Sequence, residues 1–306
     1  MKKLTILDGG MGRELKRIGA PFSQPLWSAQ ALIESPEHVR KAHQNFIDSG
    51  AQIITANSYA CVPFHLGEEL YKTDGAKLAR KAAKIAESIA LNERAYHHNT
   101  VYVAGSIPPA FGSYRPDLFK APEAKEIATA LFYAQEPHVD LWIAETISSL
   151  QEFEVIQSVL KNTRKDCYYS FTLEDEVTDI ARLRSGQTVK TATALVCYSG
   201  GKGIFFNCSV PEVMEQAIKD AKATIDSYGS NSDVEIGVFA NNFTPIQSDH
   251  KANDTLQSMR ELTPEDYLNF AKRWHALGAS VIGGCCGIQP CHIQALKEWR
   301  ETIEES

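Results

Sequence analysis

Three cysteines stand at the ends of apolar runs and together could hold a metal ion. Cys208 follows the run GIFFN, and the adjacent pair Cys285 and Cys286 follows SVIGG. Thiolate is a preferred ligand of Zn²⁺, and three protein ligands leave the fourth tetrahedral position open for a substrate atom. The alternative is that all three are small packing residues of a core. The spacing is no CxxC pair, so the prediction depends on where the fold brings the two segments.

Two adjacent cysteines can reach one ion only if the chain bends there, because neighbouring strand residues point to opposite faces. Gly283, Gly284 and Gly287 allow such a bend. The other four cysteines are expected to play no part in the site. Cys61, Cys167 and Cys197 are predicted packing residues, and Cys291 begins the last predicted helix, where a fourth thiolate would close the metal site.

Carboxylate and glycine residues end two further apolar runs. Glu145 ends LWIAE, and a carboxylate there is costly to bury without a cationic partner. We interpret Glu145 as a binding group for a substrate ammonium, with a salt bridge to Lys or Arg as the structural alternative. Asp8, Gly9 and Gly10 end the first run, where backbone N–H groups can receive a carboxylate. The pattern predicts a zwitterionic amino acid whose thiol reaches the metal.

The elements that must position these residues recur regularly. Short apolar runs alternate with stretches of helical periodicity, at residues 4–10, 52–58, 101–106, 141–146, 167–173, 203–209, 236–242 and 280–286. Continuous apolar runs are typical of parallel strands covered on both faces. The pattern predicts an α/β fold, a single (β/α)8 TIM-type barrel over residues 1–306. A doubly wound sheet is the alternative.

Helix ends can be read between these runs. Ser35-Pro36-Glu37 and Thr263-Pro264-Glu265 each predict a helix start, with stops at Gly50 and Gly278. Ser149 and Glu152 predict a capping box at the start of another helix.

A barrel places the active site at the carboxyl ends of its strands. The predicted strand ends are therefore expected to face one mouth: Asp8, Asn57, Ser106, Glu145, Thr172, Cys208, Asn241, Cys285 and Cys286.

Composition and charge limit the classes of binding partner that we expect. The 306 residues carry a net charge of −7 without a block of Lys and Arg, so no nucleic acid and no anionic membrane surface is expected. No apolar run approaches the ~20 residues of a membrane span, and the start is too short for a signal peptide. Seven irregularly spaced cysteines do not form a secreted disulfide framework. We expect a cytoplasmic protein with small-molecule substrates. The sequence does not distinguish a monomer from a homo-oligomer.

Five segments resemble the homocysteine S-methyltransferase family, in the same order and over essentially the whole chain: LDGGMGREL (7–15), IAETISSLQE (143–152), SFTLED (170–175), FFNCSVPEVMEQAI (205–218) and IGGCCGIQPCHI (282–293). The resemblance implies a (β/α)8 barrel with Zn²⁺ on Cys208, Cys285 and Cys286. It implies that Glu145 holds the amino group of homocysteine and that the carboxylate lies near Asp8, Gly9 and Gly10. Asn241 is the nearest match to an asparagine that fills the fourth zinc position in some members without substrate.

The resemblance implies methyl transfer to the zinc-bound thiolate of L-homocysteine, giving methionine. Cobalamin-dependent relatives carry further folate and cobalamin domains, which we do not expect in a chain of this length. That favours an onium donor, S-methylmethionine or S-adenosylmethionine. A cationic donor suits aromatic walls, and the residues expected to border its pocket are Trp27, Asn57, Phe64, Phe111 and Tyr114.

Two loops at the predicted mouth depart from the family pattern. GSIPPAFGSYRPDLF follows the third strand and ANNFTP follows the seventh. Betaine therefore stays open as donor, and a selenol as acceptor. A zinc hydrolase is disfavoured, because the only adjacent histidines, His97 and His98, precede the third strand at the opposite end of the barrel. A non-catalytic protein that binds homocysteine or zinc is the alternative of another class.

Overall fold

The computed structural model describes residues 3–229, 233–245 and 258–304. Within them, eight parallel strands form one sheet in the order β1-β8-β7-β6-β5-β4-β3-β2. The two ends of this order meet where Leu7 pairs with Ile53 and the Asp8 N–H donates to the Ile53 carbonyl at 3.0 Å. The expected (β/α)8 barrel is confirmed, and its strands are β1 Thr5–Ile6, β2 Ile53–Thr55, β3 Tyr102–Ile107, β4 Leu141–Ile147, β5 Cys167–Phe171, β6 Gly203–Asn207, β7 Glu235–Phe239 and β8 Val281–Ile282.

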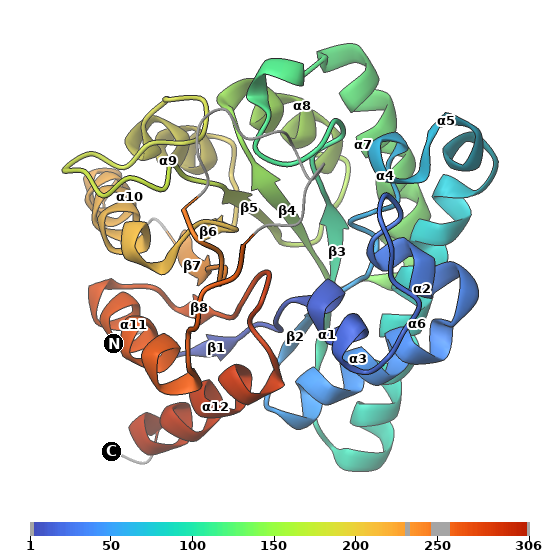
Figure 1. The fold of residues 1–306 in the computed structure, drawn as a ribbon. Coiled ribbons are helices and arrows are strands. Elements are labelled where there is room, and N and C mark those ends of the chain that lie inside the picture. The colour runs from blue at the N-terminus through green and yellow to red at the C-terminus, as the bar shows by residue number, and fades with distance from the viewer. Residues whose placement is uncertain (1–2, 230–232, 246–257, 305–306) are drawn as a thin grey trace.

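Helices surround the strands (Figure 1). The α-helices are α1 Met11–Arg17, α2 Ser28–Glu34, α3 Pro36–Asp48, α4 Pro63–Leu66, α5 Glu68–Leu70, α6 Ala76–Asn92, α7 Ala121–Gln135, α8 Leu150–Leu160, α9 Val189–Tyr198, α10 Met214–Ser227, α11 Pro264–Leu277 and α12 Pro290–Glu304. Short turns of other helix types are η1 Tyr71–Gly75, η2 Glu93–His97, η3 Pro116–Leu118, η4 Glu136–His138 and η5 Pro211–Val213. No helix of the described ranges is both long and apolar enough to cross a bilayer.

The helix starts follow the predicted signals, with one difference. Helices α3 and α11 begin at Pro36 and Pro264, and Thr263 forms a full capping box with Asp266. Ser149 accepts the Glu152 N–H at 3.2 Å, as expected. The Glu152 carboxylate, however, accepts the N–H of Ser148 at 2.7 Å instead of closing the box on Ser149. It therefore ties the end of β4 to α8 one residue earlier than predicted.

The core has two parts, inside and outside the barrel. Inside, buried side chains from the strands pack together, among them Leu7, Ile143, Phe205 and Phe239. A methyl group on Gly237 would overlap the Phe205 ring, so the strand carries glycine where that ring needs the space. Outside, the strands pack against the apolar faces of the helices. Because the interior is filled, a ligand has room only at an end of the barrel.

Candidate functional site

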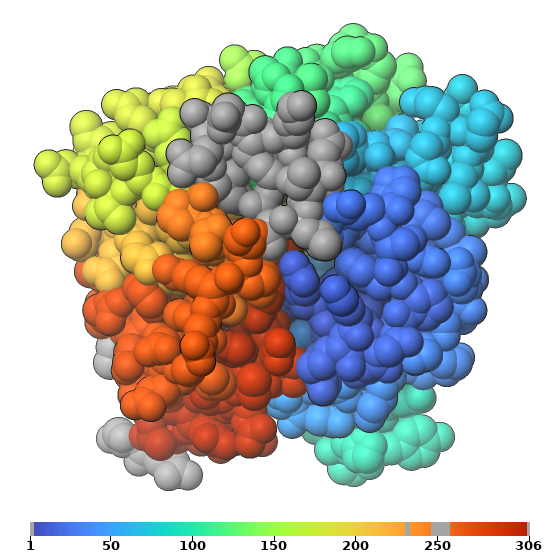
Figure 2. Space-filling model, viewed as in Figure 1, coloured from blue at the N-terminus to red at the C-terminus, as the bar shows by residue number. Residues whose placement is uncertain are grey.

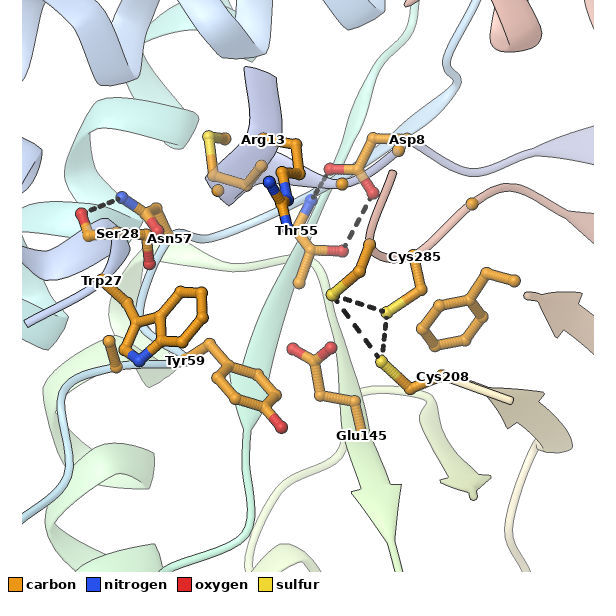
Figure 3. Close-up of a pocket in the computed structure, with 18 of the residues that line it drawn as sticks. Asp8, Arg13, Trp27, Ser28, Thr55, Asn57, Tyr59, Glu145, Cys208 and Cys285 are labelled. Atoms are coloured by element: carbon orange, nitrogen blue, oxygen red, sulfur yellow. Dashed lines mark hydrogen bonds between the residues drawn. The ribbon is translucent and has the colours of Figure 1, made fainter. Parts of the chain in front are cut away.

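A pocket opens at the carboxyl ends of the strands. In Figure 2 the surface is hollowed where the N-terminal segments, in blue, meet the C-terminal segments, in orange and red. Figure 3 shows Asp8, Glu145, Cys208 and Cys285 directed toward one space, with Trp27 and Tyr59 across from the thiols. The charged, thiol and aromatic side chains of its wall are Asp8, Arg13, Phe22, Trp27, Tyr59, His65, Tyr114, Glu145, Cys208, Phe239, Phe243, Cys285 and Cys286.

The three predicted cysteines meet in this pocket. The Sγ of Cys208 lies 2.7 Å from that of Cys285 and 3.9 Å from that of Cys286, and the adjacent pair is 4.0 Å apart. They are the group of three metal-ligating side chains found close together in the described residues. Cys291 is exposed and stands outside the group, as expected.

Backbone conformation directs these thiols to one point. Cys208, directly after β6, has a left-handed φ of 51°, which turns its side chain away from the strand alternation. On the other segment Gly287 has a φ of 86°, which glycine adopts without strain. The Cys285 N–H donates to the Ala240 carbonyl at 2.8 Å, and the buried Tyr267 hydroxyl donates to the Gly283 carbonyl at 2.5 Å. The predicted bend therefore occurs and is held by its neighbours.

The donor set fits a tetrahedral metal ion. Zn–S bonds of ~2.3 Å place tetrahedral sulfur ligands about 3.8 Å apart, and two of the three separations have this length. The third pair is closer, so one of its side chains must rotate to reach the regular triangle. Thiolate sulfur suits Zn²⁺ among the common divalent ions.

The three thiols shift one another's pKa values. Hydrogen bonds from Cys208 and Cys285 lower the pKa of Cys286 well below its usual value, while the bond from Cys285 to Cys208 raises the pKa of Cys285. The buried phenol of Tyr114 also hydrogen-bonds to Cys208, and burial holds its pKa well above the usual value, so it stays protonated. A divalent cation is what would allow all three thiols to ionise together.

Two carboxyl groups face the same space as the thiols. Asp8 accepts the Thr55 N–H at 2.7 Å, and Glu145 accepts the Ser106 hydroxyl at 2.5 Å. Burial, together with the charge of Glu145, raises the pKa of Asp8 to about 8, and burial raises the pKa of Glu145 to about 7. Among the described residues neither forms a salt bridge, so the structural alternative for Glu145 has no support. A cation bound between the two groups would stabilise the ionised form of each carboxyl group.

The glycines after Asp8 allow a close approach between two loops. A methyl group on Gly10 would lie 2.6 Å from the Cys285 carbonyl oxygen, so the first loop packs directly on the cysteine pair. The Gly10 N–H donates to the Ile288 carbonyl at 2.9 Å. Because this N–H already has a partner within the protein, a substrate carboxylate would have to bind to other groups of this loop.

Of the residues predicted for a donor pocket, Trp27, Asn57 and Tyr114 line the cavity and Phe111 does not. Phe111 packs on the outer core, because left-handed turns at Gly112 and Tyr114, with φ of 95° and 66°, bring Tyr114 into the pocket instead. Phe64 likewise packs on the core, and its neighbour His65 lines the wall.

Asn241, predicted as a fourth metal ligand, is buried and is not part of the pocket wall. Its Oδ1, the atom that would bind a metal, accepts the Phe243 N–H at 3.1 Å. Its Nδ2 has no partner in the described residues.

Several residues of the site were missed from the sequence, and four of them matter for its chemistry. Arg13, Thr55 and Tyr59 line the pocket, and Asn207 supports it from behind. Asn207 could have been found, because a polar residue ends the apolar run directly before Cys208. No local pattern marks Thr55 or Tyr59 as different from other residues after a strand.

Comparison with known proteins agrees with this geometry. The family described as Homocysteine S-methyltransferase matches residues 5–300. Homocysteine S-methyltransferase of Escherichia coli (strain K12) is 27% identical, over 96% of this chain and 94% of the relative, and Homocysteine S-methyltransferase 1 of Zea mays is 26% identical over 96% and 93%. The metallated form of the Escherichia coli homocysteine methyltransferase MmuM superposes with a TM-score of 0.79 at 25% identity, over 97% of this chain and 96% of that one. The chain belongs to the homocysteine S-methyltransferase family of enzymes.

Proposed function

We propose that this enzyme transfers a methyl group from a sulfonium donor, S-methylmethionine or S-adenosylmethionine, to the thiol of L-homocysteine, giving methionine. The observation that carries the proposal is that three thiols and two carboxyl groups, which form no ion pair within the described residues, line one pocket. The thiols select a soft metal and a sulfur ligand, and the carboxyl groups select an ammonium.

Asp8 and Glu145 would bind the ammonium group of homocysteine. With their pKa values at about 8 and 7, the two groups do not both ionise readily at neutral pH in the empty pocket. An ammonium between them stabilises both charged forms. Thr55 and Ser106 hold the carboxyl oxygens in place, which keeps the amino acid in one orientation.

Cys208, Cys285 and Cys286 would hold Zn²⁺, which, when bound, lowers the pKa of the homocysteine thiol and keeps its sulfur at a fixed point. Tyr114 shields this point, because its phenol contacts Cys208 and is itself buried.

The aromatic side of the pocket would receive the cationic donor. The ring of Trp27 packs edge-on against Phe22, with the centroids 5.6 Å apart, and Tyr59 is anchored by a 2.6 Å hydrogen bond to Ser113. Such rings attract a sulfonium cation and keep water from the reacting sulfur. The homocysteine thiolate attacks the methyl carbon as the donor's C–S⁺ bond breaks, and the bonding pair stays on the donor sulfur as a neutral thioether. The thiol proton leaves to solvent.

The test is methionine formation by reduced, zinc-loaded protein given L-homocysteine with S-methylmethionine, S-adenosylmethionine or betaine in parallel. Turnover with a sulfonium donor supports the proposal, and turnover with betaine alone contradicts the sulfonium assignment. Homocysteine binding without turnover on any donor would identify a binding protein instead. All seven cysteines lie within the described residues and none is in a disulfide, which agrees with the reducing cytoplasm as the proposed compartment.

A further inference from the structure

Arg13 brings a positive charge into the pocket that the chemistry above does not use. It is the third residue of α1, five residues after Asp8, and its side chain reaches the same space as Asp8 and Thr55 (Figure 3). Among the described residues of the wall it is the one Lys or Arg, and burial lowers the pKa of His65, which also lines the wall, to about 4. The pocket thus pairs acidic groups with a single permanent cation.

The guanidinium of Arg13 has no protein partner in the described ranges. Neither a hydrogen bond nor an ion pair joins it to another residue there. Arg17, one turn further along α1, differs: it forms two hydrogen bonds of 2.7 Å with the buried carboxylate of Glu14. A half-buried arginine loses hydration, and planar guanidinium donors are normally satisfied by an oxyanion. Arg13 is therefore positioned for an anion that comes from outside the chain.

The position of Arg13 indicates which substrate supplies that anion. Its side chain lies beside Asp8 and Thr55 and lines the same pocket as Cys285 and Cys286 (Figure 3). The Gly10 amide, which the glycine loop would have offered to a carboxylate, is engaged with Ile288. Three recognition points then surround one volume: the thiols, the carboxyl pair Asp8 and Glu145, and Arg13. They match the three functional groups of an amino-acid thiol.

We propose that Arg13 binds the α-carboxylate of homocysteine and thereby selects an amino acid over a simple aminothiol. This inference rests on the proposed function, since it assigns a group of the proposed acceptor. Two parallel N–H groups of the guanidinium would donate to the two carboxylate oxygens, while Asp8 and Glu145 bind the ammonium group. Arg13 is then a specificity-determining residue, because three-point attachment also sets the configuration of the α-carbon.

The test compares two ligands that differ by one group, L-homocysteine and 3-aminopropane-1-thiol, which lacks the carboxylate. Affinities are measured by calorimetry on zinc-loaded wild type, Arg13→Gln and Arg13→Lys, and kcat/KM is measured with S-methylmethionine. Lys16→Gln is the matched control, since it removes a positive charge from an exposed position of the same helix. Zinc content is determined for every variant.

Wild type and Lys16→Gln should favour homocysteine, and Arg13→Gln should weaken homocysteine binding about 10- to 100-fold while leaving the aminothiol unchanged. Arg13→Lys should restore part of the preference. Equal loss for both ligands, or loss of zinc, would overturn the inference and place Arg13 in the metal site. A rise in the donor's KM alone would also overturn it. Homocysteine binding without turnover contradicts methyl transfer but leaves the calorimetric comparison of Arg13 decisive.

Discussion

Asn207 and Thr146 are joined by two hydrogen bonds that pass across β5. The Asn207 Oδ1 accepts the Thr146 N–H and its Nδ2 donates to the Thr146 hydroxyl, both at 2.9 Å, and Ser170 of β5 donates to the same Oδ1 at 2.7 Å. Thr146 follows Glu145 and Asn207 precedes Cys208, so these bonds set the carboxyl group relative to the thiols. Thr146 and Cys208 both have left-handed φ values, 60° and 51°, a conformation that needs such support.

Replacing Asn207 by alanine should lower the free energy of unfolding by about 2–4 kcal/mol, because it leaves the buried N–H of Thr146 and hydroxyl of Ser170 without partners. Urea unfolding measures the loss. Asn162→Ala is the control, since Asn162 is exposed and its side chain donates to the carbonyl of Val159, three residues earlier. A change for Asn207→Ala no larger than that of the control would show that the bridge contributes little.

Cys208→Ala should abolish stoichiometric metal binding, because two thiolates and no third ligand leave the ion exposed to water and chelators. Metal content after dialysis against a weak chelator, measured by atomic emission, checks this. Cys291→Ala should keep the full metal content, since this exposed thiol lies outside the group of three. Equal metal content in both variants would contradict the site.

Glu145→Gln should raise the KM for homocysteine by about 10²-fold and leave the KM for the donor unchanged, because it removes one of two charges expected on the substrate ammonium. The amide keeps an acceptor for the Ser106 hydroxyl, so the fold should be preserved. Initial rates at varied homocysteine and at varied S-methylmethionine separate the two constants. A larger change in the KM for the donor than in the KM for homocysteine would indicate that Glu145 binds the donor instead.

Trp27→Ala should raise the KM for a sulfonium donor by about 3- to 30-fold, since the ring supplies cation–π attraction in a partly desolvated pocket. Homocysteine affinity should not change. Phe111→Ala is the informative comparison, because Phe111 belongs to the same predicted aromatic set but lies outside the pocket wall. If Phe111→Ala raised the donor KM as much as Trp27→Ala, the wall described above would be wrong.

Glu152 should make stability depend on pH. Burial raises its pKa to about 7 in the folded protein, above the ordinary 4.5 of the unfolded chain, so the folded state binds the proton more tightly. The resulting stabilisation is complete below pH 4.5 and is lost as the pH rises through about 7. Glu152→Gln lacks this titration and keeps an acceptor for the Ser148 N–H.

Relative to wild type, Glu152→Gln should therefore become more stable between pH 5 and pH 8, by about 1–3 kcal/mol. Urea unfolding at a series of pH values gives the difference, in which the other titrating groups cancel. Glu154→Gln, at an exposed position of the same helix, should show a flat difference. A flat difference for Glu152→Gln as well would show that its carboxyl group titrates normally.

The sequence by itself was sufficient for the barrel and for the part of the site that lies directly at the strand ends. Apolar runs and helix caps are local patterns, and all eight predicted strands are present. Once the strands are parallel and closed, residues near their carboxyl ends gather at one mouth, which is why Asp8, Glu145, Cys208 and Cys285 meet in one pocket. Strand-end position alone was not sufficient, because Ser106, Thr172 and Asn241 do not line the wall.

The tertiary structure decided what the loops contribute and what supports the site. Phe111 and Tyr114 are three residues apart, and only the left-handed turns between them determine that Tyr114 enters the pocket and Phe111 leaves it. The Asn207 bridge joins residues 61 positions apart, a pairing that no local pattern encodes. Arg17 pairs with Glu14, which Asn45 of α3 also contacts, while Arg13 has no partner within the described ranges, and this difference depends on how α1 packs after folding. Side-chain direction and long-range pairing arise only when the elements pack, because they depend on dihedral angles and neighbours that periodicity does not specify.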